Sequence, residues 1–199
     1  EADAVRAMAL ALNLSHEVSA AAHVPASLSA GFGSGGDALT AIRVEGFVPS
    51  VAARSAALQE QWGAFGAVTT FDADASHAFW AGMRDVAPFS SSEKPLWRLS
   101  VTPSQAPDIM AAIGEPGFMD WGGGLIWCSS EAENAGTMRS VLAAHGGGHA
   151  TLMRASEDAR RSVGVFEPQS APLASLSARV KDSFDPRRIL NPGRMYEGV

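Results

Sequence analysis

The sequence KPLWRLSV, residues 94–101, opens the part of the chain that decides its fold. Apolar and polar side chains alternate here, because Trp97 and Leu99 are separated by Arg98 and followed by Ser100. This period of two predicts a β-strand, in which successive side chains point to opposite faces of a sheet. We therefore expect Trp97 and Leu99 on one face and Arg98 and Ser100 on the other.

The residues that follow predict a complete unit of alternating strands and helices over 94–153. In chain order we expect a helix opened by the capping-box pattern Thr102-Pro103-Ser104-Gln105, a hairpin of strands 118–120 and 125–128 about Gly122-Gly123-Gly124, a helix opened by a second capping box at Ser130-Glu131-Ala132-Glu133, and a closing strand over His149–Met153. Strand-helix-strand followed by strand-helix-strand is the ferredoxin-like order. The expected fold is α+β, with helices on one face of an antiparallel sheet.

The upstream half predicts elements that share this sheet. They are an opening helix with Val5, Met8 and Leu12 inward, a strand at 17–24, a mobile connection at 25–38, a strand at 39–46, a helix after Pro49, a strand at 67–71, and a helix burying Phe79, Met83 and Val86. The connection contains a match to the dinucleotide fingerprint at Gly31–Gly36. That motif needs a helix directly after it, whereas a strand is expected, so we read it as a linker.

Composition narrows the possible functions. The 199 residues include 15 basic and 21 acidic side chains and no basic run, which argues against a nucleic-acid partner. The single cysteine, Cys128, excludes an internal disulfide, and its apolar neighbours predict an inert buried thiol. No signal peptide is visible, and no apolar run approaches the ~20 residues that cross a bilayer.

The C-terminal stretch FDPRRILNPGRMY, residues 184–196, predicts a tail whose backbone conformation is restricted at several positions. An amphipathic helix with Leu173, Leu176 and Val180 is expected to end there, because Pro186 disfavours the helical conformation in the residue before it. Pro192 and Gly193 then set the direction of the exit. Two interpretations stay open, a tail that docks onto another body and an ordinary C-terminal turn.

Four blocks in order carry a family resemblance. LWRLS at 96–100, DWGGG at 120–124, GGHAT at 147–151 and NPGRMY at 191–196 resemble the FAD-binding E subunits of bacterial glycolate oxidase, within the FAD-linked oxidases of the vanillyl-alcohol oxidase superfamily. The resemblance runs from about Phe79 to Tyr196. Upstream of Phe79 the sequence is compatible with the family but shows none of these blocks.

The resemblance implies that residues 1–199 form the C-terminal substrate or cap domain of a flavoprotein, with a helix and docking tail at 170–199. The chain begins with Glu1, so we expect a fragment or processed product whose FAD-binding N-terminal domain is missing. FAD would be held mainly by that domain, and the fragment alone would be inactive. A cytoplasmic location is implied, with any membrane association made through partner subunits.

The implied activity is oxidation of glycolate or a related 2-hydroxy acid to the 2-oxo acid. Implied partners are a related flavin subunit and an iron-sulfur subunit. Two other functions stay open: a non-catalytic assembly or electron-relay subunit of the same complex, and a stand-alone ferredoxin-like domain that binds a small molecule.

His149 and Arg98 are the candidate catalytic residues. Gly147 and Gly148 precede His149 at the start of a strand expected to be central, where glycines permit close approach of a ligand. A core histidine is the alternative, but the resemblance places this face over the flavin ring and implies substrate binding or proton abstraction. Arg98 in mid-strand suits a substrate carboxylate, with an internal ion pair or an exposed strand face as alternatives.

Three further residues have weaker assignments. Trp121 either walls a substrate pocket or fills the core edge of the hairpin. By resemblance, Asn191 and Arg194 in the tail would contact the FAD domain and its cofactor. No metal site is expected, because the glycines between His145 and His149 forbid a helix that would align both rings. We expect His145 to close a helix C-terminus instead.

Overall fold

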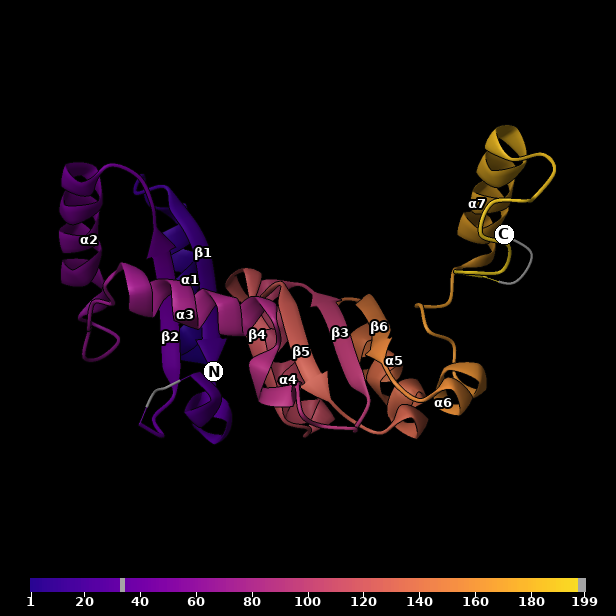
Figure 1. Ribbon diagram of the computed structural model, residues 1–199, viewed down its shortest axis with the longest axis horizontal. Coiled ribbons are helices and arrows are strands. Elements are labelled where there is room, and N and C mark those ends of the chain that lie inside the picture. The colour runs from indigo at the N-terminus through magenta and orange to yellow at the C-terminus, as the bar shows by residue number, and fades with distance from the viewer. Residues whose placement is uncertain (33–34, 197–199) are drawn as a thin grey trace.

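The computed structural model describes residues 1–32 and 35–196, which form six antiparallel strands and the helices around them (Figure 1). The sheet order is β2-β1-β4-β5-β3-β6. The strands are β1 Val18–Val24, β2 Leu39–Val44, β3 Leu96–Val101, β4 Gly117–Asp120, β5 Leu125–Ser129 and β6 Gly148–Arg154. The predicted α+β class with an antiparallel sheet is confirmed.

The α-helices are α1 Ala2–Asn13, α2 Val48–Trp62, α3 Ala73–Arg84, α4 Ala106–Ile113, α5 Ala135–Ala144, α6 Glu157–Ser162 and α7 Ala171–Phe184. Short 3-10 turns are η1 Ala26–Phe32, η2 Ala87–Phe89, η3 Pro103–Gln105, η4 Trp121–Gly123 and η5 Ala132–Asn134. From β3 onward the strands lie in the order β4-β5-β3-β6, which is the ferredoxin-like arrangement. β1 and β2 extend the sheet beyond β4.

The main core lies between one face of the sheet and helices α1, α4 and α5. Trp97 and Leu99 of β3 are fully buried there, together with Met8, Ile109 and Met138 from the three helices. The Trp97 indole also donates a hydrogen bond to the Ser130 carbonyl at 3.2 Å, so its buried N–H is satisfied. This is the strand face predicted from the alternation in residues 94–101.

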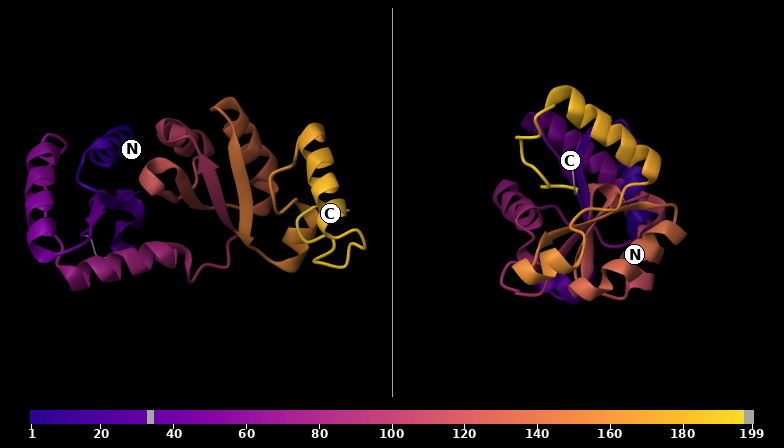
Figure 2. Two further views of the ribbon diagram at one scale, coloured as in Figure 1. Left: turned by 90° about the horizontal axis from the view of Figure 1, so that it is seen from above. Right: turned by 90° about the vertical axis from the view of Figure 1, so that its right-hand side faces the viewer.

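Helix α3 departs from the expectation that all helices cover one face. Figure 2 shows α3 on the side of the sheet opposite to α1. Its residues Phe79 and Met83 pack with Ala22 and Phe118, whose side chains point away from the main core. Because β1 and β4 are apolar on this side whereas β3 carries Arg98 there, α3 covers only part of this second face.

Several local predictions were wrong. Residues 67–71 form no strand, and the sheet's upstream strands are β1 and β2 instead. The predicted mobile connection contains η1, whose Phe32 packs against Phe79 at 5.5 Å between ring centroids. The fingerprint match includes Gly33 and Ser34, which lie outside the described residues.

Neither predicted capping box forms. Thr102 makes no side-chain cap, and the Ser130 hydroxyl donates to Glu115 Oε1 at 2.9 Å rather than capping α5. The same carboxylate accepts from Lys94 and Asn134, so Ser130 belongs to a polar cluster at the end of β5.

Helix α7 forms as predicted but buries none of its residues, and it lies beyond α6 at one end of the molecule (Figure 1). The tail turns back along it. Asp185 accepts hydrogen bonds from the backbone N–H groups of Ile189 at 3.2 Å and Leu190 at 2.9 Å, and Lys181 Nζ lies 2.9 Å from its Oδ2. The tail's last described residue, Tyr196, donates from its hydroxyl to the Glu167 carbonyl.

We expect Leu99→Ala to lower the free energy of unfolding by about 2–5 kcal/mol, because it removes a fully buried side chain and leaves a cavity. The control is Leu173→Ala, since Leu173 is 47% exposed on α7 and its truncation should change stability by less than about 0.5 kcal/mol. Urea unfolding followed by circular dichroism measures both. Equal losses in the two variants would contradict the assignment of the core.

The turn after α7 should depend on the charge of Asp185. Hydrogen bonds from the Leu190 backbone and from Lys181 hold the pKa of this carboxyl below its usual range. A lowered folded-state pKa means that the contribution is complete above the unfolded pKa and is lost as pH falls through the folded one. Asp185→Ala should lower the protection of the Ile189 and Leu190 amides against hydrogen exchange at neutral pH, and wild type should lose the same protection only in acid. Unchanged exchange in the variant would show that the carboxylate does not hold the turn.

Candidate functional site

The second face of the sheet is hollowed between α3 and the β4–β5 turn. The hollow has a volume of about 1050 Å³. Its charged and aromatic lining residues include Arg98, Asp120, Trp121, Trp127, Trp80 and Arg43. We call it the sheet groove. It is the part of the described chain where charged and aromatic side chains of several elements meet.

Arg98 and Trp121 lie together in the sheet groove. The Arg98 guanidinium carbon is 5.1 Å from the centroid of the Trp121 ring, which is a cation–π distance. Arg98 is half-buried, and among the described residues no carboxylate lies within ion-pair distance of it. The internal ion pair that the sequence left open is therefore not formed within this part of the chain.

Trp121 does not fill the core edge of the hairpin. Its side chain is 59% exposed, and its backbone has a φ of +53° within η4. The two following glycines are buried, and a Cβ atom on Gly122 would come 2.5 Å from Leu12 Cδ1 of α1. Gly122 therefore lets the turn pack closely on α1, and Trp121 beside it lines the groove.

Asp120 is the last residue of β4 and lines the same groove. Its Oδ1 accepts a hydrogen bond from the Trp121 backbone N–H at 2.7 Å. Burial raises the pKa of the Asp120 carboxyl, and that hydrogen bond opposes the rise in part. The sequence motif contained this residue, but no role followed from the sequence because nothing there showed that the carboxyl faces a groove.

His149 lies on the same face of the sheet as Arg98, since it pairs with Ser100 in the register of β3 and β6. The expectation of a central strand was wrong, because β6 is the last strand at this end of the sheet. His149 is exposed and does not line the groove. Gly148 has a φ of +151°, and a Cβ there would lie 2.5 Å from the Ser100 carbonyl oxygen. Gly148 therefore allows β3 to approach β6 closely at this point.

The tail residues lie far from these groups. Asn191 and Arg194 are exposed in the segment after α7, at the opposite end of the molecule from α2 (Figure 1). Neither side chain makes a hydrogen bond or ion pair in the described part of the chain. The structure thus brings Arg98 and Trp121 together and places His149 on their face, but it does not bring Asn191 or Arg194 to them.

Two smaller predictions are confirmed. His145 closes α5, with its Nδ1 2.8 Å from the Val141 carbonyl oxygen. Cys128 is 2% exposed, and burial raises its pKa to about 12, so the thiol is unreactive at neutral pH. Within residues 1–32 and 35–196, no three His, Cys, Asp or Glu side chains are grouped to hold a metal ion.

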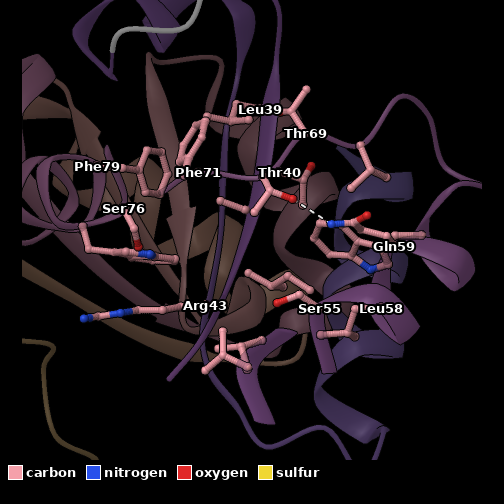
Figure 3. A pocket seen from close by; sticks show the side chains of 18 of the residues that line it. Leu39, Thr40, Arg43, Ser55, Leu58, Gln59, Thr69, Phe71, Ser76 and Phe79 are labelled. Atoms are coloured by element: carbon pink, nitrogen blue, oxygen red, sulfur yellow. Dashed lines mark hydrogen bonds between the residues drawn. The ribbon is translucent and has the colours of Figure 1, made fainter. Parts of the chain in front are cut away.

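A second hollow of about 220 Å³ lies between β2, α2 and residues 67–71 (Figure 3). All six residues of β2 line it. Because successive side chains of a strand point to opposite faces, this pocket lies against the unpaired edge of β2. Across it, Gln59 Nε2 donates to the Thr70 hydroxyl at 2.7 Å. Its only charged lining residue, Arg43, pairs with Glu45 at 2.9 Å. This pocket offers hydroxyls and apolar surface but no acid–base pair, so the sheet groove is the better candidate site.

No family model matches the chain. A search of curated proteins finds glycolate oxidase subunit GlcE of Escherichia coli (strain K12), 42% identical over 119 residues. This chain is similar to GlcE. The resemblance predicted from the four sequence blocks is thereby confirmed. The match covers 59% of this chain and 31% of the relative, so the chain spans about a third of the length of that subunit. No helix among the described residues is long and apolar enough to span a membrane.

We expect Gly122→Ala to destabilise the protein, because the new methyl group would meet Leu12 and the residue has a φ of +65°. The loss should exceed about 1 kcal/mol in urea unfolding. Gly147→Ala is a matched control, since Gly147 also has positive φ, at +84°, but has no atom within 4 Å of the added Cβ. Similar losses in both variants would mean that the close approach to α1 does not matter.

Proposed function

We propose that this chain is the substrate-facing lobe of the FAD-binding subunit of a glycolate oxidase complex, and that the whole protein oxidises glycolate or a related 2-hydroxy acid to the 2-oxo acid. One observation carries the proposal. The Arg98 guanidinium is half-buried on an open sheet face, held against Trp121, with no carboxylate of the described chain beside it. The similarity to GlcE supports the same reading.

Arg98 is the group that binds the substrate carboxylate in this proposal. A partly buried guanidinium without an anion is unfavourable, and a carboxylate ligand would supply paired charge-assisted hydrogen bonds. Trp121 restricts the side chain to the groove and forms one wall of it. The three tryptophans that line the groove would exclude water from a bound ligand and so strengthen the ionic contact.

The described residues fit contact with a flavin ring better than they fit its phosphates. Trp121 presents an exposed indole toward the space above the sheet, as a stacking partner for a planar ring would. The glycine-rich match at Gly31–Gly36 is followed by β2 rather than by a helix whose N-terminus could receive a pyrophosphate. FAD, held mainly by a domain outside this chain, would supply the two-electron acceptor.

His149 has a binding role in this proposal. It lies one strand from β3 on the groove face, and its exposure at the sheet edge suits a side chain that meets the substrate from the open side. The two tail residues, Asn191 and Arg194, are proposed to contact the FAD domain and its cofactor. Their side chains are exposed and unengaged in the described chain, as a contact to another body requires.

The surface of α7 and its tail is proposed to dock onto the proposed FAD-binding lobe or onto partner subunits, namely a related flavin subunit and an iron-sulfur subunit. Its apolar side chains are between 47% and 85% exposed: Leu173, Leu176, Val180, Phe184, Ile189, Leu190 and Met195. Four of them, Leu176, Val180, Phe184 and Leu190, line one shallow hollow, and exposed apolar patches mark interaction sites in soluble proteins.

The same surface favours a second candidate, a non-catalytic assembly or electron-relay subunit of that complex. In that case α7 would be the functional feature, and turnover would take place in the related flavin subunit. The position of the tail after α7, beyond α6 and away from β3, is consistent with it. A stand-alone small-molecule-binding domain is less well supported, because α7 would then have no purpose for its apolar face.

The test uses the full-length protein assembled with its partners and assayed with glycolate and D-lactate against a dye acceptor. Arg98→Ala should raise KM roughly 10- to 100-fold, the effect of losing hydrogen bonds to a charged group. Arg98→Lys should recover part of that loss. Arg6→Ala is the control, since Arg6 is exposed on α1 and pairs only locally with Asp3.

If Arg98→Ala and His149→Ala both left KM and kcat unchanged, the catalytic role would be lost and the assembly role favoured. Disruption of the α7 surface by Phe184→Asp should then abolish complex formation in size-exclusion chromatography.

A further inference from the structure

We propose that Asp120 is a catalytic residue that accepts the proton of the substrate hydroxyl while Arg98 holds the substrate carboxylate. The inference rests on the proposed function and adds to it, because it names the group that takes the proton of the substrate hydroxyl. It also divides the roles on this face, leaving His149 to binding.

Charge pairing in the groove singles out these two residues. Among the groove's cations, Arg43 pairs with Glu45 at 2.9 Å and Arg84 pairs with Asp85 at 2.8 Å. Arg98 and Asp120 line the same groove, and neither has an oppositely charged partner in the described part of the chain. The groove therefore presents one uncompensated cation and one uncompensated carboxylate. A ligand with an anionic end and a proton-donating group matches that pair.

Trp121 explains why Arg98 and Asp120 do not neutralise each other. Its indole ring lies against the Arg98 guanidinium, whereas its backbone N–H donates to Asp120 Oδ1. One residue thus engages both groups from different ends. Each keeps part of its hydrogen-bonding capacity free, because a guanidinium has five donors and a carboxylate accepts from several directions.

The sheet register places the two side chains at a distance suited to a small ligand. Asp120 pairs with Leu125, Leu125 pairs with Ser100, and Ser100 follows Arg98 by two residues on the same face. Strand spacing and rise then put the Cα atoms of Asp120 and Arg98 about 12 Å apart. Both residues line the sheet groove, so a molecule of two or three carbons bound between them would meet both side chains.

The protonation chemistry also fits. Burial raises the pKa of Asp120, which makes its carboxylate a stronger proton acceptor than a solvated one. In the step, the substrate O–H bond breaks and its proton goes to Asp120. The electron pair of that bond would form the carbonyl of the 2-oxo acid as the α-hydrogen leaves with its own electron pair, and a bound flavin would supply the two-electron acceptor. Arg98, Arg43, His77 and Arg84 are the charged or titratable groups that face Asp120 from β3, β2 and α3.

The experiment compares Asp120→Asn with Asp108→Asn in the full-length, partner-assembled protein. Asparagine still accepts the Trp121 N–H through its amide oxygen, so the turn is retained while the proton acceptor is lost. Asp108 is an exposed acid on α4 and serves as the control. Asp120→Asn should lower kcat for glycolate at least about 100-fold, with KM changed less than about threefold. Asp108→Asn should leave both unchanged.

A second readout does not depend on turnover. Oxalate places a second carboxylate where the hydroxyl of glycolate would lie, so the charge of Asp120 should oppose its binding. Calorimetry should show tighter oxalate binding in Asp120→Asn than in wild type, and wild-type binding should strengthen as pH falls through the pKa of Asp120. His77→Gln should keep this pH dependence, since the proposal assigns it to Asp120.

The outcomes separate the two levels of the proposal. If Arg98→Ala abolishes oxalate binding while Asp120→Asn keeps wild-type kcat, the Asp120 role is overturned and the groove remains the substrate site. If Arg98→Ala changes neither oxalate binding nor turnover, the proposed function itself fails. If kcat falls with His149→Gln and not with Asp120→Asn, the proton acceptor is His149, which also overturns the assignment.

Discussion

The register of β3 is the constraint on which the rest of the structure depends. This strand is paired on both sides, with β5 and with β6, and its alternate residues face opposite sides of the sheet. A shift by one residue would turn Trp97 out of the core and Arg98 into it. Burying an unpaired guanidinium would cost several kcal/mol, so the core and the groove enforce the same register.

The β4–β5 turn positions Trp121 in the groove of the candidate site. Gly122 packs closely on Leu12 of α1, and Trp121 beside it lies against Arg98 in the sheet groove. The contact between α1 and this turn thus helps to fix the position of the Trp121 ring. The groove is therefore built on the rigid part of the fold, where the positions of its side chains are well defined.

Sequence patterns predicted the ferredoxin-like half because its signals are local. The alternation in 94–101, the glycine turn and the helix over 135–144 each report on nearby residues, and the strand order follows from a known arrangement. The side of the sheet that α3 covers could not be predicted, because it depends on the contact between Phe79 and Phe118, far apart in sequence. The same limit applies to β6, whose position at the edge is set by which strands pair.

The residues of the candidate site also differ in how far the sequence could predict them. Arg98 was found from the sequence because an arginine between two apolar residues of a strand is unusual wherever it points. Asp120 was not, because its significance lies in sharing a groove with a cation two strands away. Residues 67–71 show the opposite error. Their β-branched and aromatic composition favours a strand, but they line a pocket beside β2 without pairing with it.

The bare apolar side of α7 has a consequence for the turnover of the protein if this helix docks onto a partner as proposed. A copy made without its neighbours would display Phe184 and the leucines of that helix to the surroundings. Chaperones and proteases act on exposed apolar segments, so an orphan copy would be cleared faster than an assembled one. If α7 docks onto a partner as proposed, the abundance of this protein should follow that of the partner, which would couple its supply to assembly without a separate regulator.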